Sequence, residues 1–506
     1  MKIFGTIGGK KPLKILFVAA EAAPFAKVGG LGSVMYSLTK ALSRLGHDVR
    51  VMMPRYLSIS DEAYHLTLEY KGLKVPTGNE KGETDLVCNV KRYNPGTDSE
   101  DPVITYFLEN QEYYEQRANV YGYADDAARW LMLCRGALEF VRAKTGWTPD
   151  VIVSCDWQAA LIPNLLKTVY KADPILSKVA SVLSIHNLYF QGMFDHHFVS
   201  EMDFDDGHSP VPPMESERLS KINWMRRGII YADIVNTVSP NYAKEIMTKD
   251  YGELLDELLR ERKSRLSGIL NGIDYMVWNP KTDPYIAETY DAHTLEMRQK
   301  NKVALQERFG LPVNPKAFVV AYVGRFTKQK GLDLFSPIAE TLLRELPMQF
   351  IAVGEGDADI MTFLHDLETK FPDKVAVHLK FDPILPHIVD AGTDAIIMPS
   401  RFEPCGLSQM EAMRMGAIPI VRKTGGLADS VEDYNPEKGT GTGFVFEKFD
   451  SSSLMVAFIR AFENFRDKPK WRALQARAME KDFSWDNSAK KYAALFVRAI
   501  EAHHLS

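Results

Sequence analysis

The sequence predicts an α/β protein with two doubly wound domains, each built around a parallel sheet. Three observations lead to this prediction: the chain length, the alternation of apolar runs with helical patterns, and a glycine motif that occurs once in each half. With 506 residues the chain is too long for a single hydrophobic core, because domains usually contain ~100–250 residues. Two domains of ordinary size are therefore expected.

The first half opens with a strand–helix–strand pattern. An apolar run at 15–20 leads through a glycine-rich turn into a helical pattern with apolar residues at Val34, Leu38 and Ala41, and a second apolar run follows at 49–53. Later apolar runs alternate with helical patterns, as parallel strands joined by helices require. The expected strands are 103–108, 151–155, 179–185 and 234–237, and the expected helices include 124–144 and 158–170.

A second alternating series follows a charged stretch that contains several prolines. Its strands are expected at 318–323, 349–353, 375–379, 395–398 and 418–421. We place an N-terminal domain at 1–264 and a C-terminal domain at 265–484. The final amphipathic segment, 485–506, is expected to form a helix that packs back on the N-terminal domain.

Composition and charge exclude several classes of protein. The 61 basic and 66 acidic residues give a formal net charge of -5, so no positive field attracts nucleic acid or an anionic membrane. The first apolar run ends at Glu21 and is too short for a signal peptide or a membrane span. The cysteines are widely separated, which argues against a zinc site or a disulfide framework and favours the cytoplasm; they are Cys88, Cys134, Cys155 and Cys405.

The glycine motif predicts an anion-binding loop. It reads K-V-G-G-L at 27–31 and K-T-G-G-L at 423–427, each after a strand and before a helix, where open α/β sheets bind ligands. The N–H groups of Gly29 and Gly30 suit a diphosphate, and Lys27 adds a positive charge. A nicotinamide site is the competing interpretation, but the motif lacks the third glycine of G-x-G-x-x-G and the second strand does not end in an acidic residue.

A loop of the second half places two cations after a strand. Arg325 and Lys330 follow the expected strand 318–323. An arginine fork and a mobile lysine can together neutralise a leaving nucleoside diphosphate without a metal ion. As an isolated pair they would more often be solvated loop charges.

The segment 399–407 reads P-S-R-F-E-P-C-G-L and carries an acid ahead of a helix. Glu403 precedes a proline, which favours extended backbone and a position in the loop before the helix. Glu411 follows two helical turns later. The ordinary interpretations are an N-terminal helix acid for Glu403, a solvated helix face for Glu411 and a small buried residue for Cys405.

An Asp-Phe-Asp sequence at 203–205 raises the alternative of a metal site. A D-x-D pair holds the nucleotide-bound cation in metal-dependent glycosyltransferases. No strong strand precedes Asp203 and Asp205, and the polar stretch runs on to Pro213, so we expect a solvated loop. No metal is predicted.

The motifs occur in the order found in glycogen and starch synthases, and the chain resembles this family, glycosyltransferase family 5, over nearly its whole length. The resemblance implies the GT-B fold, in which two Rossmann-like domains face a central cleft. The motifs that carry it are K-V-G-G-L at 27–31, C-D-W at 155–157, H-N-L-Y-F-Q-G at 186–192, N-G-I-D at 271–274, the 325–331 loop, R-F-E-P-C-G-L at 401–407, T-G-G-L-A-D at 424–429 and G-T-G-F at 441–444.

The resemblance also implies roles for individual residues. The catalytic set it implies is Asp156, His186, Arg325, Lys330 and Glu403. The donor-binding set it implies is Lys27, Gly29, Gly30, Asn187, Arg325, Lys330, Glu403, Cys405, Gly406, Leu407 and Glu411. Within these sets the cations hold the diphosphate, Glu403 lies by the donor glucose, and no nucleophile is assigned.

By the same resemblance, the reaction transfers glucose from a nucleotide-glucose donor, with ADP-glucose favoured over UDP-glucose, to the non-reducing end of an α-1,4-glucan. The acceptor is glycogen, starch or a malto-oligosaccharide, and the configuration is retained. No cofactor and no metal are expected. Neither nucleic acid nor a membrane is an expected partner, and the oligomeric state is not predicted. The location is cytoplasmic, or plastidial for a mature plant protein.

Three positions depart from the family pattern and keep alternatives open. Ser33 replaces an aspartate, Gln158 replaces a histidine, and Asp126 replaces an asparagine. Ser33 can still cap the helix as aspartate does; if the family's aspartate instead touches substrate, its loss changes donor or acceptor preference. The E-x7-E spacing of Glu403 and Glu411 is typical of another, family 4-like group of retaining transferases that use different sugar acceptors. A catalytically silent glucan-binding relative is a third hypothesis, which the intact set of charged residues disfavours.

Overall fold

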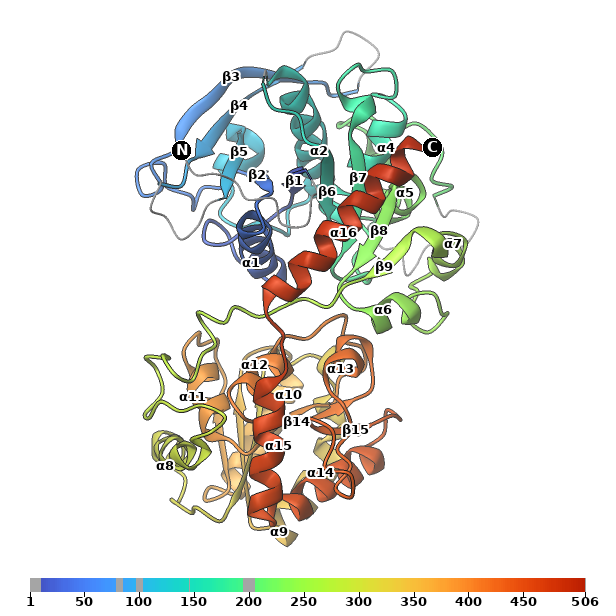
Figure 1. The fold of residues 1–506 in the computed structure, drawn as a ribbon. Coiled ribbons are helices and arrows are strands. Elements are labelled where there is room, and N and C mark those ends of the chain that lie inside the picture. Colours follow the sequence, from blue (N-terminus) through green and yellow to red (C-terminus); the bar gives the residue numbers. More distant parts are fainter. Residues whose placement is uncertain (1–10, 79–84, 97–102, 145, 194–204, 506) are drawn as a thin grey trace. The chain divides into compact units, whose positions relative to one another are not determined.

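The computed structural model describes residues 11–78, 85–96, 103–144, 146–193 and 205–505. The contacts divide the chain into two compact units (Figure 1). The first unit comprises residues 1–238, 243–269 and 485–506, and the second comprises 239–242 and 270–484. Among the described residues no helix has the length and apolar character needed to cross a bilayer.

The first unit is built on a nine-stranded sheet in the described part of the chain, with the order β3-β4-β5-β2-β1-β6-β7-β8-β9. From β5 to β9 all neighbours pair in parallel. Strands β2 to β5 lie on one side of β1 and strands β6 to β9 lie on its other side, so the strand order reverses between β1 and β6. The strands are β1 Lys14–Val18, β2 Asp48–Pro54, β3 Thr67–Val75, β4 Leu86–Tyr93, β5 Ile104–Glu109, β6 Val151–Cys155, β7 Ala180–Ile185, β8 Ile234–Thr237 and β9 Leu266–Gly268.

Helices cover this sheet, and the last helix of the chain belongs to it (Figure 1). Helix α16 packs on α1 and β7, and Asp486 near its start pairs with Arg44 at 2.7 Å. The helices are α1 Gly30–Arg44, α2 Asp126–Ala143, α3 Asp156–Ala159, α4 Leu161–Lys167, α5 Trp224–Tyr231, α6 Pro240–Glu245, which spans both units, α7 Asp256–Glu261 and α16 Trp485–His504.

Two features of this unit differ from the sequence prediction. The antiparallel strands β3 and β4 were not predicted, because much of β3 is exposed and it lacks a continuous apolar run. The helix predicted at 158–170 is divided into α3 and α4 at Ala160. Pro163 explains the division, since its ring has no N–H and clashes with the carbonyl group four residues earlier.

The second unit has a six-stranded, all-parallel sheet in the order β12-β11-β10-β13-β14-β15. This order repeats the pattern of the first unit, with its reversal between β10 and β13. The strands are β10 Phe318–Val323, β11 Met348–Val353, β12 Val375–His378, β13 Ala395–Met398, β14 Ile418–Arg422 and β15 Phe444–Phe446. The helices are α8 Arg298–Arg308, α9 Ser336–Glu345, α10 Ala358–Lys370, α11 Leu385–Gly392, α12 Ser408–Arg414, α13 Gly425–Ser430, α14 Ser451–Phe465 and α15 Lys468–Glu480.

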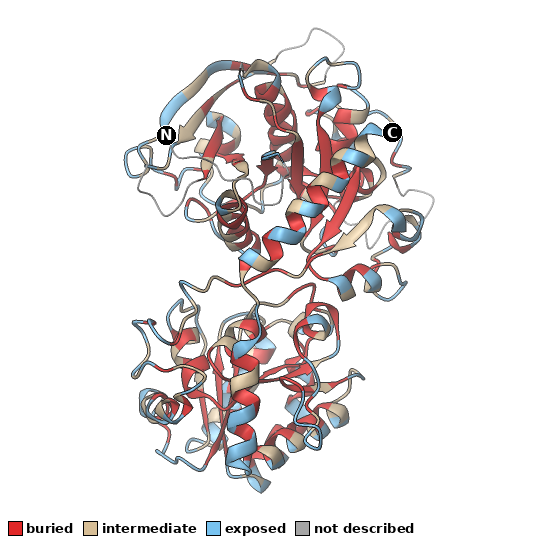
Figure 2. Ribbon diagram, in the orientation of Figure 1, coloured by how far each residue is buried: buried red, intermediate tan, exposed pale blue. Residues whose placement is uncertain are grey.

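The central strands of both sheets are buried on both faces, while the helices expose one side (Figure 2). Continuous apolar runs are the pattern that such strands require. The predicted fold class, two doubly wound α/β domains, is confirmed by this architecture and by the solved relatives described below.

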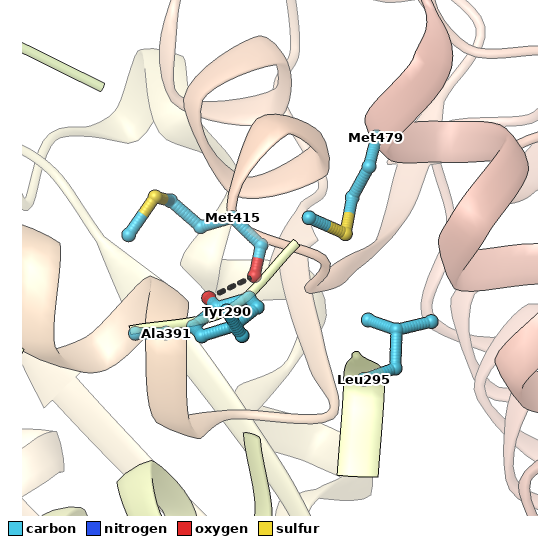
Figure 3. Close-up of a cluster of buried hydrophobic side chains, with 5 residues drawn as sticks. All are labelled: Tyr290, Leu295, Ala391, Met415 and Met479. Carbon is cyan, nitrogen blue, oxygen red and sulfur yellow. Dashed lines mark hydrogen bonds between the residues drawn. The ribbon is translucent and has the colours of Figure 1, made fainter. Parts of the chain in front are cut away.

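A small apolar cluster fixes the segment that enters the second unit (Figure 3). Tyr290 and Leu295 pack with Ala391 of α11, Met415 after α12 and Met479 of α15. The hydroxyl group of Tyr290 donates a hydrogen bond to the carbonyl oxygen of Met415 at 2.6 Å. The end of α12 is therefore held both by apolar contacts and by this hydrogen bond, which stabilise the helix that carries Glu411.

Candidate active site

Both units place their polar motifs where the strand order reverses. In the first unit, the loop after β1 contains Lys27, and Asp156 follows β6 directly. In the second unit, the loop after β10 carries Arg325 and Lys330, and the loop after β13 contains Glu403. Ligands of open α/β sheets bind at the carboxyl ends of the strands at such a reversal. Each unit therefore presents a candidate ligand site.

The K-V-G-G-L loop of the first unit is organised by a residue that the sequence analysis did not single out. Glu21 is 3% exposed, and its Oε2 accepts hydrogen bonds from the N–H groups of Val28 at 2.5 Å and Gly29 at 3.0 Å. The N–H group of Gly29 is thus occupied and does not point to a free anion site as expected. Gly30 begins α1, and a Cβ there would meet nothing within 4 Å.

The expected capping role of Ser33 is wrong. Helix α1 begins at Gly30 and its N-cap position is Gly29, so Ser33 lies inside the first turn. No side chain at the N-cap position makes a cap hydrogen bond. The carboxylate of Glu21 instead satisfies N–H groups at this helix start, a position that the helix dipole favours for an anion.

Asp156 and His186 lie together at the ends of neighbouring strands. The Oδ1 atom of Asp156 accepts hydrogen bonds from the N–H groups of His186 at 2.7 Å and Asn187 at 3.3 Å. Asp156 has a φ angle of 56°, the left-handed region that few side chains adopt and that aspartate and asparagine tolerate best. The imidazole Nε2 of His186 lies 3.2 Å from the hydroxyl oxygen of Ser184.

Burial shifts the pKa values of both side chains toward their neutral forms. Desolvation raises the pKa of Asp156 to about 7, against the two backbone hydrogen bonds that lower it, and the charge of Glu21 raises it further. Desolvation lowers the pKa of His186 to about 4. His186 is therefore neutral near pH 7, while Asp156 changes its charge in that range. Perturbed groups of this kind cluster at functional sites.

An ion pair dominates the site of the second unit. The Nζ atom of Lys330 lies 2.6 Å from Oε2 of Glu403, whose side chain is 6% exposed. The hydroxyl group of Ser400 donates a second hydrogen bond to the same oxygen at 3.1 Å. Arg325 is exposed on the same loop, and its carbonyl oxygen accepts a hydrogen bond from the hydroxyl group of Tyr322 at 2.7 Å. The loop pair predicted from sequence thus includes one cation that is paired and one that is exposed.

Two motifs of the second unit, the 325–331 loop and K-T-G-G-L at 423–427, contact the 399–407 loop through glycine backbone. A Cβ at Gly331 would lie 2.0 Å from the carbonyl oxygen of Pro399, and one at Gly426 would lie 2.0 Å from that of Cys405. The N–H group of Gly426 donates to the carbonyl oxygen of Glu403 at 3.1 Å. These backbone contacts of Gly331 and Gly426 fix the position of the 399–407 loop.

We predict that Gly426→Ala destabilises the second unit by about 1–3 kcal/mol, because the added methyl group overlaps the backbone of Cys405 and only a backbone shift can relieve the overlap. Gly30→Ala is the matched change in the other K-x-G-G-L motif, where space is open, and it should alter stability by less than about 0.5 kcal/mol. Thermal unfolding of the two variants measures the difference. Equal unfolding temperatures would contradict this assignment of close packing.

The remaining predicted residues of the second unit lie in the 399–407 loop or in α12, which follows it. Cys405 is buried, and burial raises the pKa of its thiol to about 12, so it remains protonated and serves no thiolate chemistry. Gly406 and Leu407 complete the turn into α12, where Gly406 has a φ angle of 69°. Glu411 is half-buried on α12. Burial raises the pKa of Asp390 on α11, and the charge of Glu411 raises it further. Glu411 is therefore not on a solvated helix face.

In the Asp-Phe-Asp sequence at 203–205, the described residue Asp205 forms a buried ion pair. Asp203 and Phe204 lie outside the described residues. The side chain of Asp205 is 5% exposed and pairs with Arg227 through both carboxylate oxygens at 2.8 Å. The expectation of a solvated loop is wrong for Asp205, because the buried guanidinium group of Arg227 needs this partner. In the described parts of the chain, no group of three or more potential ligand side chains is gathered to hold a metal ion.

The H-N-L-Y-F-Q-G motif carries an exposed aromatic pair shortly after His186, for which the sequence analysis predicts no role. Tyr189 is 41% exposed and Phe190 is 57% exposed, and their rings meet edge to face with centroids 5.3 Å apart. The Oδ1 atom of Asn187 accepts the N–H group of Tyr189 at 3.1 Å and so shapes the turn. Adjacent exposed rings beside polar residues are a signal for ligand contact.

Two doubly wound units in one chain, each with polar side chains at its strand-order reversal, are the architecture of the GT-B glycosyltransferases, and the comparisons with known proteins assign the chain to this class. Residues 14–261 match the sequence model of the starch synthase catalytic domain, and residues 304–478 match that of glycosyl transferases group 1. The chain belongs to the glycogen and starch synthase family, as the resemblance of its motifs predicted.

Relatives match over nearly the whole chain. The glycogen synthase of Thermotoga petrophila is 42% identical over 493 residues, covering 96% of this chain and 99% of that protein. The glycogen synthase of Clostridium perfringens is 41% identical over 493 residues, covering 97% of this chain and 100% of its own length.

Solved structures agree with the sequence comparisons. The catalytic domain of starch synthase IV from Arabidopsis thaliana, bound to ADP and acarbose, has a TM-score of 0.83 at 32% identity and covers 97% of this chain and 100% of its own. Sucrose-phosphate synthase from Thermosynechococcus elongatus has a TM-score of 0.57 at 18% identity with the same coverage, and supports the fold alone.

Proposed function

We propose that this glycosyltransferase extends α-1,4-glucan by transferring glucose from ADP-glucose to the non-reducing end of the chain with retention of configuration. The observation that carries the proposal is the Lys330–Glu403 pair at the strand-order reversal of the second unit. The Arabidopsis relative is bound to ADP and acarbose, which are a nucleoside diphosphate and an oligosaccharide mimic. Glycogen synthases are the relatives at 41–42% identity.

The charges suit the transition state of glycosyl transfer. Positive charge develops on the sugar and negative charge on the departing phosphate. Arg325 and Lys330 provide cations for the leaving group, and Glu403 and Asp156 provide anions that balance the sugar. The role of Lys27 toward the diphosphate and the absence of a metal ion and of any other cofactor stay predictions, as does a cytoplasmic location.

Transfer of radiolabelled glucose tests the proposal and the donor nucleotide together. Purified protein is incubated with glycogen and either ADP-glucose or UDP-glucose, and label in precipitated glucan is counted. Incorporation from ADP-glucose at a higher kcat/KM than from UDP-glucose is expected. Release of nucleoside diphosphate without label in glucan would favour a transferase that uses another acceptor, and no release from any sugar donor would overturn the enzymatic proposal.

The aromatic pair beside His186 is expected to bind the glucan acceptor. Phe190→Ala should raise the KM for malto-oligosaccharide at least about tenfold, because burying a phenyl side chain against a sugar contributes roughly 1.5–3 kcal/mol. The KM for the sugar donor should change little. Val456→Ala, which removes another exposed apolar side chain on α14, is the control. An unchanged acceptor KM in Phe190→Ala would exclude this role.

A further inference from the structure

Glu21 lies between the Lys27 loop and the segment that contains Tyr121 within the first unit. It directly follows the apolar run of β1, and its carboxylate is almost completely buried. One oxygen binds the N–H groups of Val28 and Gly29. The other accepts a hydrogen bond from the hydroxyl group of Tyr121 at 3.1 Å. The two oxygens thus connect two separate segments of the chain.

The partners of this carboxylate are all neutral donors. Over the described residues, no lysine, arginine or histidine forms an ion pair with Glu21. A buried carboxylate without a cation is costly unless hydrogen bonds replace its lost water. The start of α1 offsets part of that cost through its dipole. Packing around the carboxylate is close, because a Cβ at Gly32 would lie 3.2 Å from its Oε2 atom.

Glu21 occupies the anion position that the sequence analysis assigned to the donor diphosphate. The N–H groups ahead of a helix are a ready anion site, and here two of them are already bound to a carboxylate. The N–H group of Gly29 is therefore not available to a phosphate, whereas the side chain of Lys27 is exposed and the surface at Gly30 is open.

We propose that Glu21 is a positioning residue, which holds the Lys27–Gly30 loop in its donor-binding shape through its hydrogen bonds to Val28, Gly29 and Tyr121. The proposal rests on the proposed function for the identity of the donor, but the hydrogen bonds that fix the loop do not depend on it.

The charge of Glu21 also acts on its titratable neighbours. These are Tyr56 after β2, Tyr121 before α2, and Asp156 and His186 at the ends of β6 and β7. In each of them burial is the largest cause of the pKa shift, and the Glu21 charge raises the pKa. Replacing the carboxylate with a neutral amide is therefore expected to lower the pKa of Asp156.

Hydrogen exchange tests the loop-fixing role without any assay of activity. Amide exchange of the peptide that spans 27–32 is followed by mass spectrometry in the wild type, Glu21→Ala, Glu21→Asp and the exposed control Glu62→Gln. We expect exchange at least tenfold faster in Glu21→Ala, an intermediate rate in Glu21→Asp, and the wild-type rate in Glu62→Gln. Unchanged exchange in Glu21→Ala would overturn the proposal.

Kinetics of the isosteric variant separate positioning from simple loss of stability. Glu21→Gln should raise the KM for the sugar donor at least tenfold and leave the KM for glucan near that of the wild type. The acidic limb of its pH profile should move to lower pH. An equal rise in the KM for the sugar donor and the KM for glucan, with an unchanged pH profile, would reject positioning. Wild-type protein that makes no glucan from any donor would overturn the proposed function, while the exchange result still decides whether Glu21 fixes the loop.

Discussion

Lys330→Ala is expected to lower kcat by about 10²–10³-fold, because it removes a preorganised cation from the position where leaving-group charge develops. Its ammonium group lies 2.6 Å from Glu403, so the variant also leaves a buried carboxylate with fewer partners. Loss of one partner of a buried hydrogen bond costs roughly 1–3 kcal/mol. Initial rates of glucan synthesis at saturating ADP-glucose, together with urea unfolding curves, measure both effects.

Lys328→Ala is the matched control for this prediction. Lys328 is exposed in the same short helical turn, so the variant removes a lysine from the loop without touching Glu403. It should retain the wild-type rate and stability. Near-normal turnover in Lys330→Ala, or a loss in Lys328→Ala of the same size, would show that the ion pair has no special part in the reaction.

Asp156→Asn is expected to lower kcat by about 10²-fold through loss of negative charge near the sugar. Asparagine keeps an oxygen that can accept the N–H groups of His186 and Asn187, and it tolerates the left-handed backbone. The variant therefore tests charge with little change of shape. Because burial raises the pKa of Asp156 to about 7, the wild-type rate should rise as pH increases through that value, and the variant should lose this dependence.

The raised pKa of Asp156 also predicts that stability falls with increasing pH, whereas the rate rises. The folded protein binds the Asp156 proton more tightly than the unfolded chain, whose value is near 3.8. The stability that this group contributes is complete below pH 4 and is lost as pH rises through about 7. Asparagine does not carry this penalty, so the stability of Asp156→Asn relative to the wild type should rise as pH increases through about 7. Asp366→Asn, an exposed change on α10, should show neither effect, and a pH-independent wild-type rate would contradict the assignment.

The buried strands could be predicted from sequence because both of their faces are covered. The apolar runs at 151–155, 234–237 and 318–323 coincide with β6, β8 and β10, since no polar face interrupts the pattern. The antiparallel strands β3 and β4 could not be found in this way, because much of β3 is exposed and most of β4 is only partly buried. The break between α3 and α4 was accessible from Pro163, whose effect on a helix is known.

The site could be predicted only where several residues form a motif. Arg325, Lys330 and Glu403 belong to long motifs, and the structure brings Lys330 and Glu403 into contact. Glu21 is a single acid after a strand, and its hydrogen bonds to Val28 and Gly29 depend on how the loop folds back. The role of Asp205 could not be predicted either, because nothing in the sequence around it indicates that it pairs with Arg227.

A crystal structure of the protein with ADP tests the central claim most directly. We expect the oxygens of the diphosphate to lie within hydrogen-bond distance of the side chains of both Arg325 and Lys330, above the loop that contains Glu403. A diphosphate bound in another part of the second unit, with both of these side chains directed to solvent, would contradict the proposed mechanism of leaving-group stabilisation.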